Sequence, residues 1–201
     1  MRVLDPSVQA ALEARAITMR DFVWIIARDR VDQTPVPYGM WSGIGTISAS
    51  VIDPLTGSPV SRTFVGAGGL VEISPVPMTA NMTVQSVTVS LSHLADANDL
   101  IRAYDIRQAR IEVWRGMFTP SMQQISAAVP RFVGFIDEAS IPTPAENQIG
   151  SADLTCVSHS QEMSRSNPAT RSDADTRRRD PTDTFRLHAA AVGTWEVNWS
   201  S

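Results

Sequence analysis

The chain has 201 residues, of which 43% are hydrophobic and 19% are charged, a composition typical of a folded globular protein. Its formal net charge of −4 at pH 7 argues against a protein built mainly to hold nucleic acid, because such proteins carry a basic excess. No apolar stretch is long enough to predict a membrane-spanning helix, and the first residues lack the pattern of a secretory signal peptide.

The basic residues and the cysteine restrict the kinds of surface and site that the chain can form. All 17 basic residues are arginine, whose planar guanidinium suits protein interfaces and carboxylate pairing better than a lysine ammonium does. The single cysteine, Cys156, excludes an internal disulfide and a four-cysteine metal site. We therefore expect synthesis in a reducing compartment and a surface suited to assembly.

The first predicted element is a short helix over residues 6–15. Asp5 fits the N-cap position and Pro6 the first helical position. Apolar residues from Val8 to Leu12 follow the helical period. Their stripe is too small to stabilise an isolated helix, so we expect this helix to dock on its own chain or on a neighbour.

Alternating or β-branched apolar runs predict strands along most of the remaining chain. In one of them Val87, Val89 and Leu91 alternate with polar residues, and a phase slip at Gln85–Ser86 indicates a β-bulge. The predicted strands cover residues 22–29, 45–53, 87–94, 109–116, 131–141, 151–159 and 193–200.

The segments between the strands differ in length. Composition predicts a turn at 54–59, a brief helix at 95–105 and a hairpin loop at 142–150. Two segments, 54–81 and 160–185, have the composition of long loops, and loops of such length are usually functional or ordered by partners.

Seven strands against two short helices predict a mostly-β fold, a sandwich or barrel with a short N-terminal helix and long loops or arms. We expect an N-terminal helical segment at 1–20, a β core at 21–160, and a C-terminal arm with a last strand at 161–201.

The sequence offers one candidate for nucleophilic catalysis, a C-x-x-H spacing of Cys156 and His159. A thiolate nucleophile needs a base and an orienting third group nearby, and His93 and His188 have no spacing that would complete a metal site. Because Cys156 falls in mid-strand on the apolar side, a buried core cysteine is the favoured interpretation. A cysteine hydrolase is the enzymatic alternative.

Other candidate motifs are weaker. The glycine run at 66–69 matches neither a Walker loop nor a dinucleotide fingerprint. The acidic pair Asp137–Glu138 has the character of solvated loop charges. We therefore predict a protein that is not an enzyme, with no catalytic residue, no cofactor and no metal.

The stretch TRRRDPTDTF, residues 176–185, is the strongest candidate for a functional surface. It lies in a segment with six arginines and four aspartates between Arg165 and Arg186. Nucleic-acid-binding arms are usually purer in charge, whereas mixed arginine and aspartate favour pairing within the chain or across a subunit boundary. Asp180–Pro181 ends any helix that the preceding residues begin. A nucleic-acid-binding module and a merely solvated loop are the alternatives.

Several motifs resemble small tail-tip proteins of long-tailed bacteriophages and of the related gene transfer agents. The likeness lies in MRVLDPSVQAAL, YDIRQARIEVWRG, RFVGFIDEASI and the stretch from LTCVSHSQEM to RRRDPTDTF, and it covers most of the chain. The family pattern has an R-x-x-G-x-[IV]-D strand, a later arginine and an [RQ]-R-x-D-P-x-D-x-[FM] segment. The matching residues are Arg131, Gly134, Ile136, Asp137, Arg165, Arg179, Asp180, Pro181, Asp183 and Phe185.

This resemblance implies a structural virion protein of the tail tip or baseplate. It would be a hub-type component that links the tail tube to the central baseplate proteins, or else a distal tail protein. Its β core would be tail-tube-like and arranged in a ring of three or six copies. The protein would be made in the cytoplasm of a bacterial host and incorporated at the tail tip.

The resemblance also implies partner proteins, and the chain differs from larger members of the family. The partners would be the tail tube, the distal-tail or hub protein and the central tip protein, with no membrane involved. Larger hub proteins carry extra domains and cysteine ligands for a metal cluster, which this chain with one cysteine does not match. We expect its arm to dock on a neighbouring subunit or tail protein through Arg165, Arg171, Arg177, Arg178, Arg179, Asp180, Asp183 and Phe185.

Overall fold

The computed structural model describes residues 5–67, 70–76, 83–92, 101–143, 146, 150–164, 172–189 and 191. The chain forms two compact units that divide between Met163 and Ser164. The elements are α1 (Pro6–Glu13), β1 (Thr18–Asp29), β2 (Pro35–Trp41), β3 (Ile44–Ile52), β4 (Pro59–Ala67), β5 (Leu70–Ile73), β6 (Ser86–Ser92), β7 (Tyr104–Phe118), β8 (Val129–Ser140), β9 (Ser151–Ser158), α3 (Gln161–Ser164) and α4 (Asp173–Arg179).

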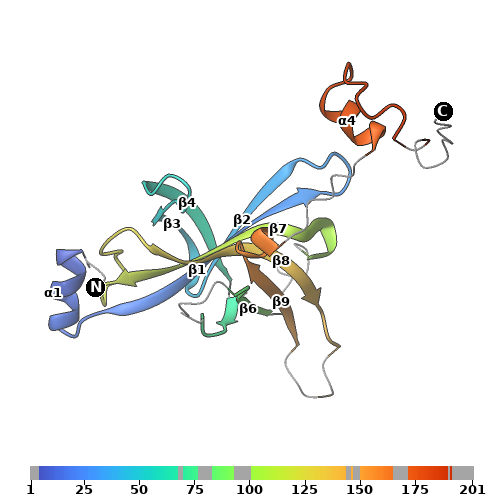
Figure 1. The fold of residues 1–201 in the computed structure, drawn as a ribbon. Helices are drawn as coiled ribbons and strands as arrows, with labels where there is room; N and C mark the ends of the chain where they lie inside the picture. Colours follow the sequence, from blue (N-terminus) through green and yellow to red (C-terminus); the bar gives the residue numbers. More distant parts are fainter. Residues whose placement is uncertain are drawn as a thin grey trace, which may run out of the picture. The chain divides into compact units, whose positions relative to one another are not determined.

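The short N-terminal helix forms where the sequence predicts it. An Asp5 carboxylate oxygen accepts a hydrogen bond from the Ser7 backbone N–H at 2.9 Å, and Pro6 occupies the first turn. Val8 is buried, whereas Leu12 is 41% exposed. The helix therefore docks on its own chain through one face, beyond one end of β1 and β7 (Figure 1).

The strands of the first unit form one mixed sheet in the order β3-β4-β2-β1-β7-β8-β9-β6-β5. Neighbouring strands are antiparallel except β2 and β4, which run parallel and share one register pair, Met40 and Val65. The longest pairing joins β1 to β7 and begins with Thr18 opposite Phe118. These two strands form the centre of the unit (Figure 1).

Two hydrophobic cores lie on opposite faces of β1 and β7. One core contains Val23 and Val113 together with apolar side chains of β6, β8 and β9. The other contains Phe22 and Trp114 together with side chains of β3 and β4. Because side chains alternate along a strand, consecutive residues of β1 enter different cores. The prediction of a mostly-β fold of sandwich or barrel type with a short N-terminal helix is confirmed.

The predicted long loop over 54–81 is wrong, because β4 and β5 lie within it. The turn at its start is present, with Gly57 at a φ of 69°. On β4 the inward positions include Phe64, which is buried, and Arg62, which pairs with a buried carboxylate. A charged residue on the inward face removes the apolar alternation by which a strand is recognised.

Strand β2 is also missing from the predicted set, so the prediction of seven strands is too low for the described residues. Its sequence PVPYGMW contains Pro35 and Pro37, which indicate a break rather than a strand. Prolines are tolerated where no neighbour needs their N–H. Here β4 pairs with β2 only near Met40, so the proline-containing end of β2 pairs on one side only, with β1.

The other strand predictions that fall on described residues agree with the structure within a few residues, and two further predictions need correction. Strand β6 begins at Ser86 and pairs with β9 without a register shift, so the bulge expected at Gln85–Ser86 is not in the ladder. Of the helix predicted at 95–105, only residues 101–103 are described as helical, and β7 already starts at Tyr104. The predicted strand at 193–200 lies outside the described residues.

Candidate functional site

The arginine-rich stretch forms a short capped helix, α4. The Ser172 hydroxyl oxygen accepts a hydrogen bond from the Asp175 backbone N–H at 3.3 Å, and Asp180 is the C-cap. Pro181 follows directly, as the prediction that Asp-Pro ends a helix requires. Acidic residues in the first turn and arginines in the last turn suit the helix dipole. The expectation of a loop over all of 160–185 is therefore wrong.

Two of the three consecutive arginines pair inside this helix. Arg177 contacts Asp173 and Arg179 contacts Asp175, each at 2.9 Å and four residues apart. Pairing within the chain, one of the two arrangements that the sequence predicts, is thus present. Arg178 is exposed and makes no ion pair with another described residue. It is the arginine of the run whose charge is available to a partner.

Two aspartate turns follow α4 and hold the chain in a defined path. An Asp180 carboxylate oxygen accepts hydrogen bonds from the Thr182 N–H at 2.9 Å and from its hydroxyl at 2.7 Å, and these bonds lower the pKa of Asp180. The Asp183 carboxylate accepts the Phe185 N–H at 2.8 Å. Phe185 itself is 88% exposed.

We call residues 172–189 the arm. None of its residues is buried, so the described part of the second unit holds no hydrophobic core. Of the predicted interface residues, Arg177, Arg178, Arg179, Asp180, Asp183 and Phe185 belong to the arm, while Arg165 and Arg171 lie outside the described residues. A mixed-charge segment with a large exposed aromatic ring and no core has the character of a docking element.

The pattern R-x-x-G-x-I-D, which is part of the resemblance, lies on β8, and each of its last three members has a distinct structural setting. A side chain at Gly134 would place its Cβ 2.0 Å from the Val157 carbonyl oxygen, so only glycine allows β8 and β9 to approach this closely. Ile136 is fully buried in a core. Asp137 is exposed and lines a pocket.

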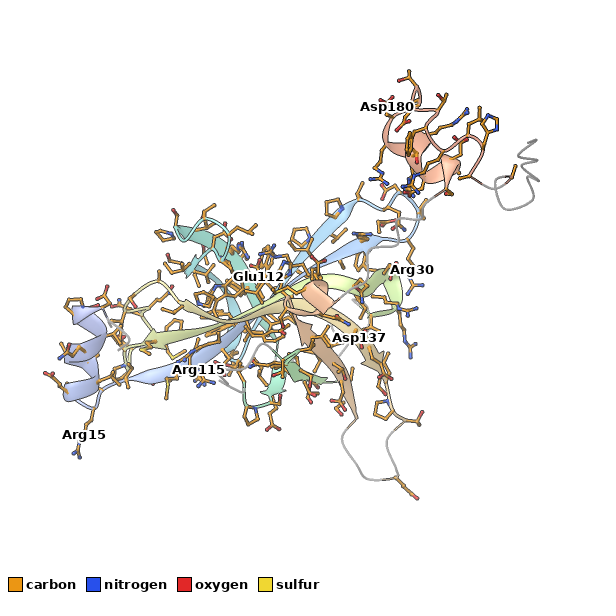
Figure 2. The ribbon with its side chains drawn as sticks, in the orientation of Figure 1. Arg15, Arg30, Glu112, Arg115, Asp137 and Asp180 are labelled. Atoms are coloured by element: carbon orange, nitrogen blue, oxygen red, sulfur yellow. The ribbon has the colours of Figure 1, made fainter. Side chains whose placement is uncertain are left out.

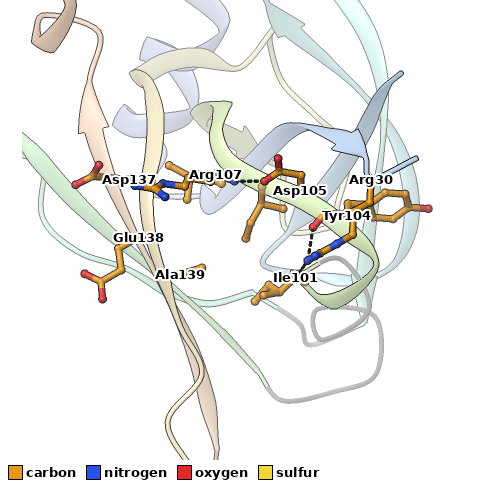
Figure 3. A pocket seen from close by; sticks show the side chains of 10 residues that line it. Arg30, Ile101, Tyr104, Asp105, Arg107, Asp137, Glu138 and Ala139 are labelled. Carbon is orange, nitrogen blue, oxygen red and sulfur yellow. Dashed lines mark hydrogen bonds between the residues drawn. The ribbon is translucent and has the colours of Figure 1, made fainter. Parts of the chain in front are cut away.

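This pocket lies where β7 and β8 part. Their pairing stops at Arg110 and Phe135, although the strands continue to Tyr104 and Ser140. A pocket of about 560 Å³ is formed between these strand ends, which pair with β1 and β9 but not with each other (Figure 3).

A large irregularity in β7 shapes one wall of the pocket. Opposite Ile26 lies Arg110, and opposite Arg28 lies Asp105, so β1 advances by two residues while β7 advances by five. Gln108, within this excess, has a φ of 58°. Such a bulge turns side chains away from the regular alternation of the strand.

A second bulge, in β8, forms the other wall. The register shifts between Ile136 and Glu138, so that Asp137 is the extra residue. We call the site the fork pocket and define it by its five charged side chains, all exposed: Arg30, Asp105, Arg107, Asp137 and Glu138. The sequence interpretation of Asp137 and Glu138 as loop charges is wrong, because both lie on β8, whereas their exposure agrees with the expected solvation. Nothing in the local sequence reveals that two distant bulges coincide.

Within the fork pocket the charges are only partly engaged. The Arg30 guanidinium donates hydrogen bonds to the backbone carbonyls of Tyr104 at 3.2 Å and Ile101 at 3.4 Å, and the Arg107 backbone N–H donates to the Asp105 carboxylate at 3.2 Å (Figure 3). The side chains of Arg107, Asp137 and Glu138 form no ion pair with other described residues.

A separate cluster of charges is buried at the contact between β4 and β7. Glu112, which is labelled in Figure 2, is 2% exposed. Its two carboxylate oxygens accept hydrogen bonds from Arg62 and Arg110, each at 2.7 Å. The Arg62 guanidinium also lies 5.0 Å from the ring centre of Trp24 and 5.2 Å from that of Trp114. This arrangement satisfies a buried carboxylate and fastens β4 across the central strands.

The C-x-x-H pair consists of a buried cysteine and an exposed histidine. Cys156 is fully buried in a core, and burial raises the pKa of its thiol to about 12. His159 is exposed, and its ring lies 5.1 Å from that of Phe135. The interpretation of Cys156 as a core cysteine is confirmed.

We expect Cys156 to be inert toward a thiol reagent in the folded protein. With a thiol pKa of about 12 and no exposed surface, almost no accessible thiolate exists near neutral pH. Dithiobis-nitrobenzoate added to the native protein should release almost no thionitrobenzoate, whereas the denatured protein should release one equivalent. Rapid release from the native protein would contradict the buried placement and would favour the cysteine-hydrolase alternative.

No helix among the described residues has the length and hydropathy to cross a membrane. In the same residues, no group of three or more histidine, cysteine, aspartate or glutamate side chains is placed to hold a metal ion.

Comparison with known proteins places the fold. No protein-family model matches the chain, and no curated protein matches it. The fold resembles that of a chain in a solved structure described as "Virion of native gene transfer agent (GTA) particle", with a TM-score of 0.55 and 12% sequence identity. The likeness covers 84% of this chain and 49% of that chain, so this chain spans about half the length of its structural neighbour. The protein therefore shares its fold with about half of a chain of a gene transfer agent virion.

Proposed function

We propose that this protein is a structural subunit of a phage-type particle. The fold likeness to a chain of a gene transfer agent virion carries the proposal. The arm supports it, because a segment without a buried residue and with an 88% exposed phenylalanine is suited to hold a neighbouring subunit. A virion subunit has to make such contacts repeatedly, and mixed charges give them specificity.

Within the particle we place the protein at the tail tip, as a hub-type component between the tail tube and the central baseplate proteins. This placement rests on the sequence resemblance, whose matching residues include Gly134 and Asp137 on β8 and Asp180 and Phe185 on the arm. A ring of three or six copies is the expected assembly. A distal tail protein in a similar ring is the alternative placement.

Immunogold electron microscopy of particles from the source organism tests this proposal. Antibodies against the purified protein should label one end of the tail, with no label on the head. Label along the whole tail or on the head would overturn the tail-tip placement while leaving a virion subunit.

Particles without any label, with all protein in the soluble lysate, would overturn the proposal itself. In that case a salt-dependent gel shift of DNA would support the nucleic-acid-binding alternative. The intrahelical pairing of Arg177 and Arg179 counts against that alternative, because it neutralises two of the three arginines in the run.

A further inference from the structure

We propose that the arm of one copy docks in the fork pocket of a second copy. The proposal rests on the proposed function, which it deepens by naming both surfaces of the subunit contact. Its occupant is the segment Arg177–Phe185 of the second copy.

The charges of the two surfaces are complementary. The fork pocket presents three carboxylates and two guanidiniums. Of the three arginines in the segment 177–185, two are paired within α4, so the guanidinium of Arg178 is the charge that the segment offers to the pocket carboxylates. On the arm, Arg178 has no ion pair, and in the pocket Asp137 and Glu138 have none among the described residues. Complementary charges left unpaired on both surfaces favour docking and fix its direction.

The apolar parts also correspond. Phe185 is 88% exposed, and the fork pocket is lined by Ile106 and Ile136, which are buried, and by the partly buried Ala139. Exposed aromatic and arginine side chains are the usual centres of protein interfaces. The pocket is open to solvent, and its volume of about 560 Å³ lies in the range of small-molecule sites.

The arm has local contacts of its own that favour one conformation. The helix α4 has its own cap and two internal ion pairs, and the turns at Asp180 and Asp183 hold the backbone that leads to Phe185. A segment with its conformation already set loses less conformational entropy on docking.

The contact joins two different surfaces of the same chain. Each copy offers an arm and receives one, and such a head-to-tail contact produces a ring when its rotation closes. The geometry of the ring then depends on one repeated contact between arm and fork pocket.

Cysteine cross-linking tests the contact. One batch of protein carries Arg178→Cys and the other carries Glu138→Cys; the native Cys156 is buried and does not compete. Mixed in equal amounts with a short bis-maleimide, the two batches should give a heterodimer in several-fold higher yield than a control mixture of Arg15→Cys with Glu138→Cys. An excess of wild-type protein should reduce that yield, whereas protein carrying Phe185→Ala should compete less.

The outcomes separate this proposal from the proposed function. A heterodimer yield equal to that of the control overturns docking in the fork pocket. The same conclusion follows if a chain that carries both cysteines cross-links only within itself at every protein concentration. If either result is obtained and antibodies label the tail tip, the virion proposal still holds. The arm then docks at a site other than the fork pocket. A heterodimer with unlabelled particles would support the contact and overturn the tail-tip function.

Discussion

Glu112→Gln is expected to lower the free energy of unfolding by about 3 kcal/mol, the scale for breaking a buried ion pair. Glutamine keeps the shape of the side chain but removes the charge that Arg62 and Arg110 share at 2.7 Å each. Both arginines would then stay near the core without a full countercharge, although Asp53 remains 3.8 Å from Arg62. Chemical denaturation followed by tryptophan fluorescence measures the loss, because Trp24 and Trp114 flank the cluster.

An ion pair nearer the surface supplies the matched control. Asp21 accepts two hydrogen bonds from Arg115, at 2.7 and 3.1 Å, but the two side chains are 27% and 41% exposed. Asp21→Asn should therefore cost less than about 1 kcal/mol, since solvent screens exposed pairs. Equal losses for the two variants would show that burial does not set the strength of the Glu112 cluster.

Arg178→Glu is expected to abolish or strongly reduce incorporation of the protein into particles without changing its thermal stability. Arg178 is exposed and has no ion pair within the described arm, so its charge contributes little to folding. In a subunit contact, however, reversal of a charge that faces an opposite charge produces repulsion. Counting labelled tails by electron microscopy in a strain that makes only the variant measures the effect, and circular dichroism checks the fold.

The single substitution tests the docking role more specifically than charge reversal of all three arginines from Arg177 to Arg179. Reversing Arg177 and Arg179 as well would set like charges four residues apart from Asp173 and Asp175 and would weaken α4 itself. Arg15→Glu is the control, because it makes the same charge change at another exposed arginine. Normal tails with Arg178→Glu, or equal loss with Arg15→Glu, would contradict a specific role for the arm.

The strands of this protein differ in how clearly their local sequence patterns predict them. Strand β6, with Val87, Val89 and Leu91 on one face, is recognisable because only one face meets a core. Strand β4 is not recognisable from its sequence, because its inward Arg62 is accommodated by Glu112, fifty residues away in sequence. Strand β2 is not recognisable either, because its sequence contains prolines. These prolines are tolerated because β4 pairs with β2 only near Met40.

By itself the sequence determined the mostly-β class, the helix start at Asp5, the core placement of Cys156 and the aspartate–proline end of α4, because each depends on neighbours along the chain. Only the tertiary structure decided the fork pocket and the Glu112 cluster. The pocket requires bulges in β7 and β8 to meet where the strands part, and the cluster requires β4 to cross β7. Both depend on register between distant strands, which local periodicity does not encode.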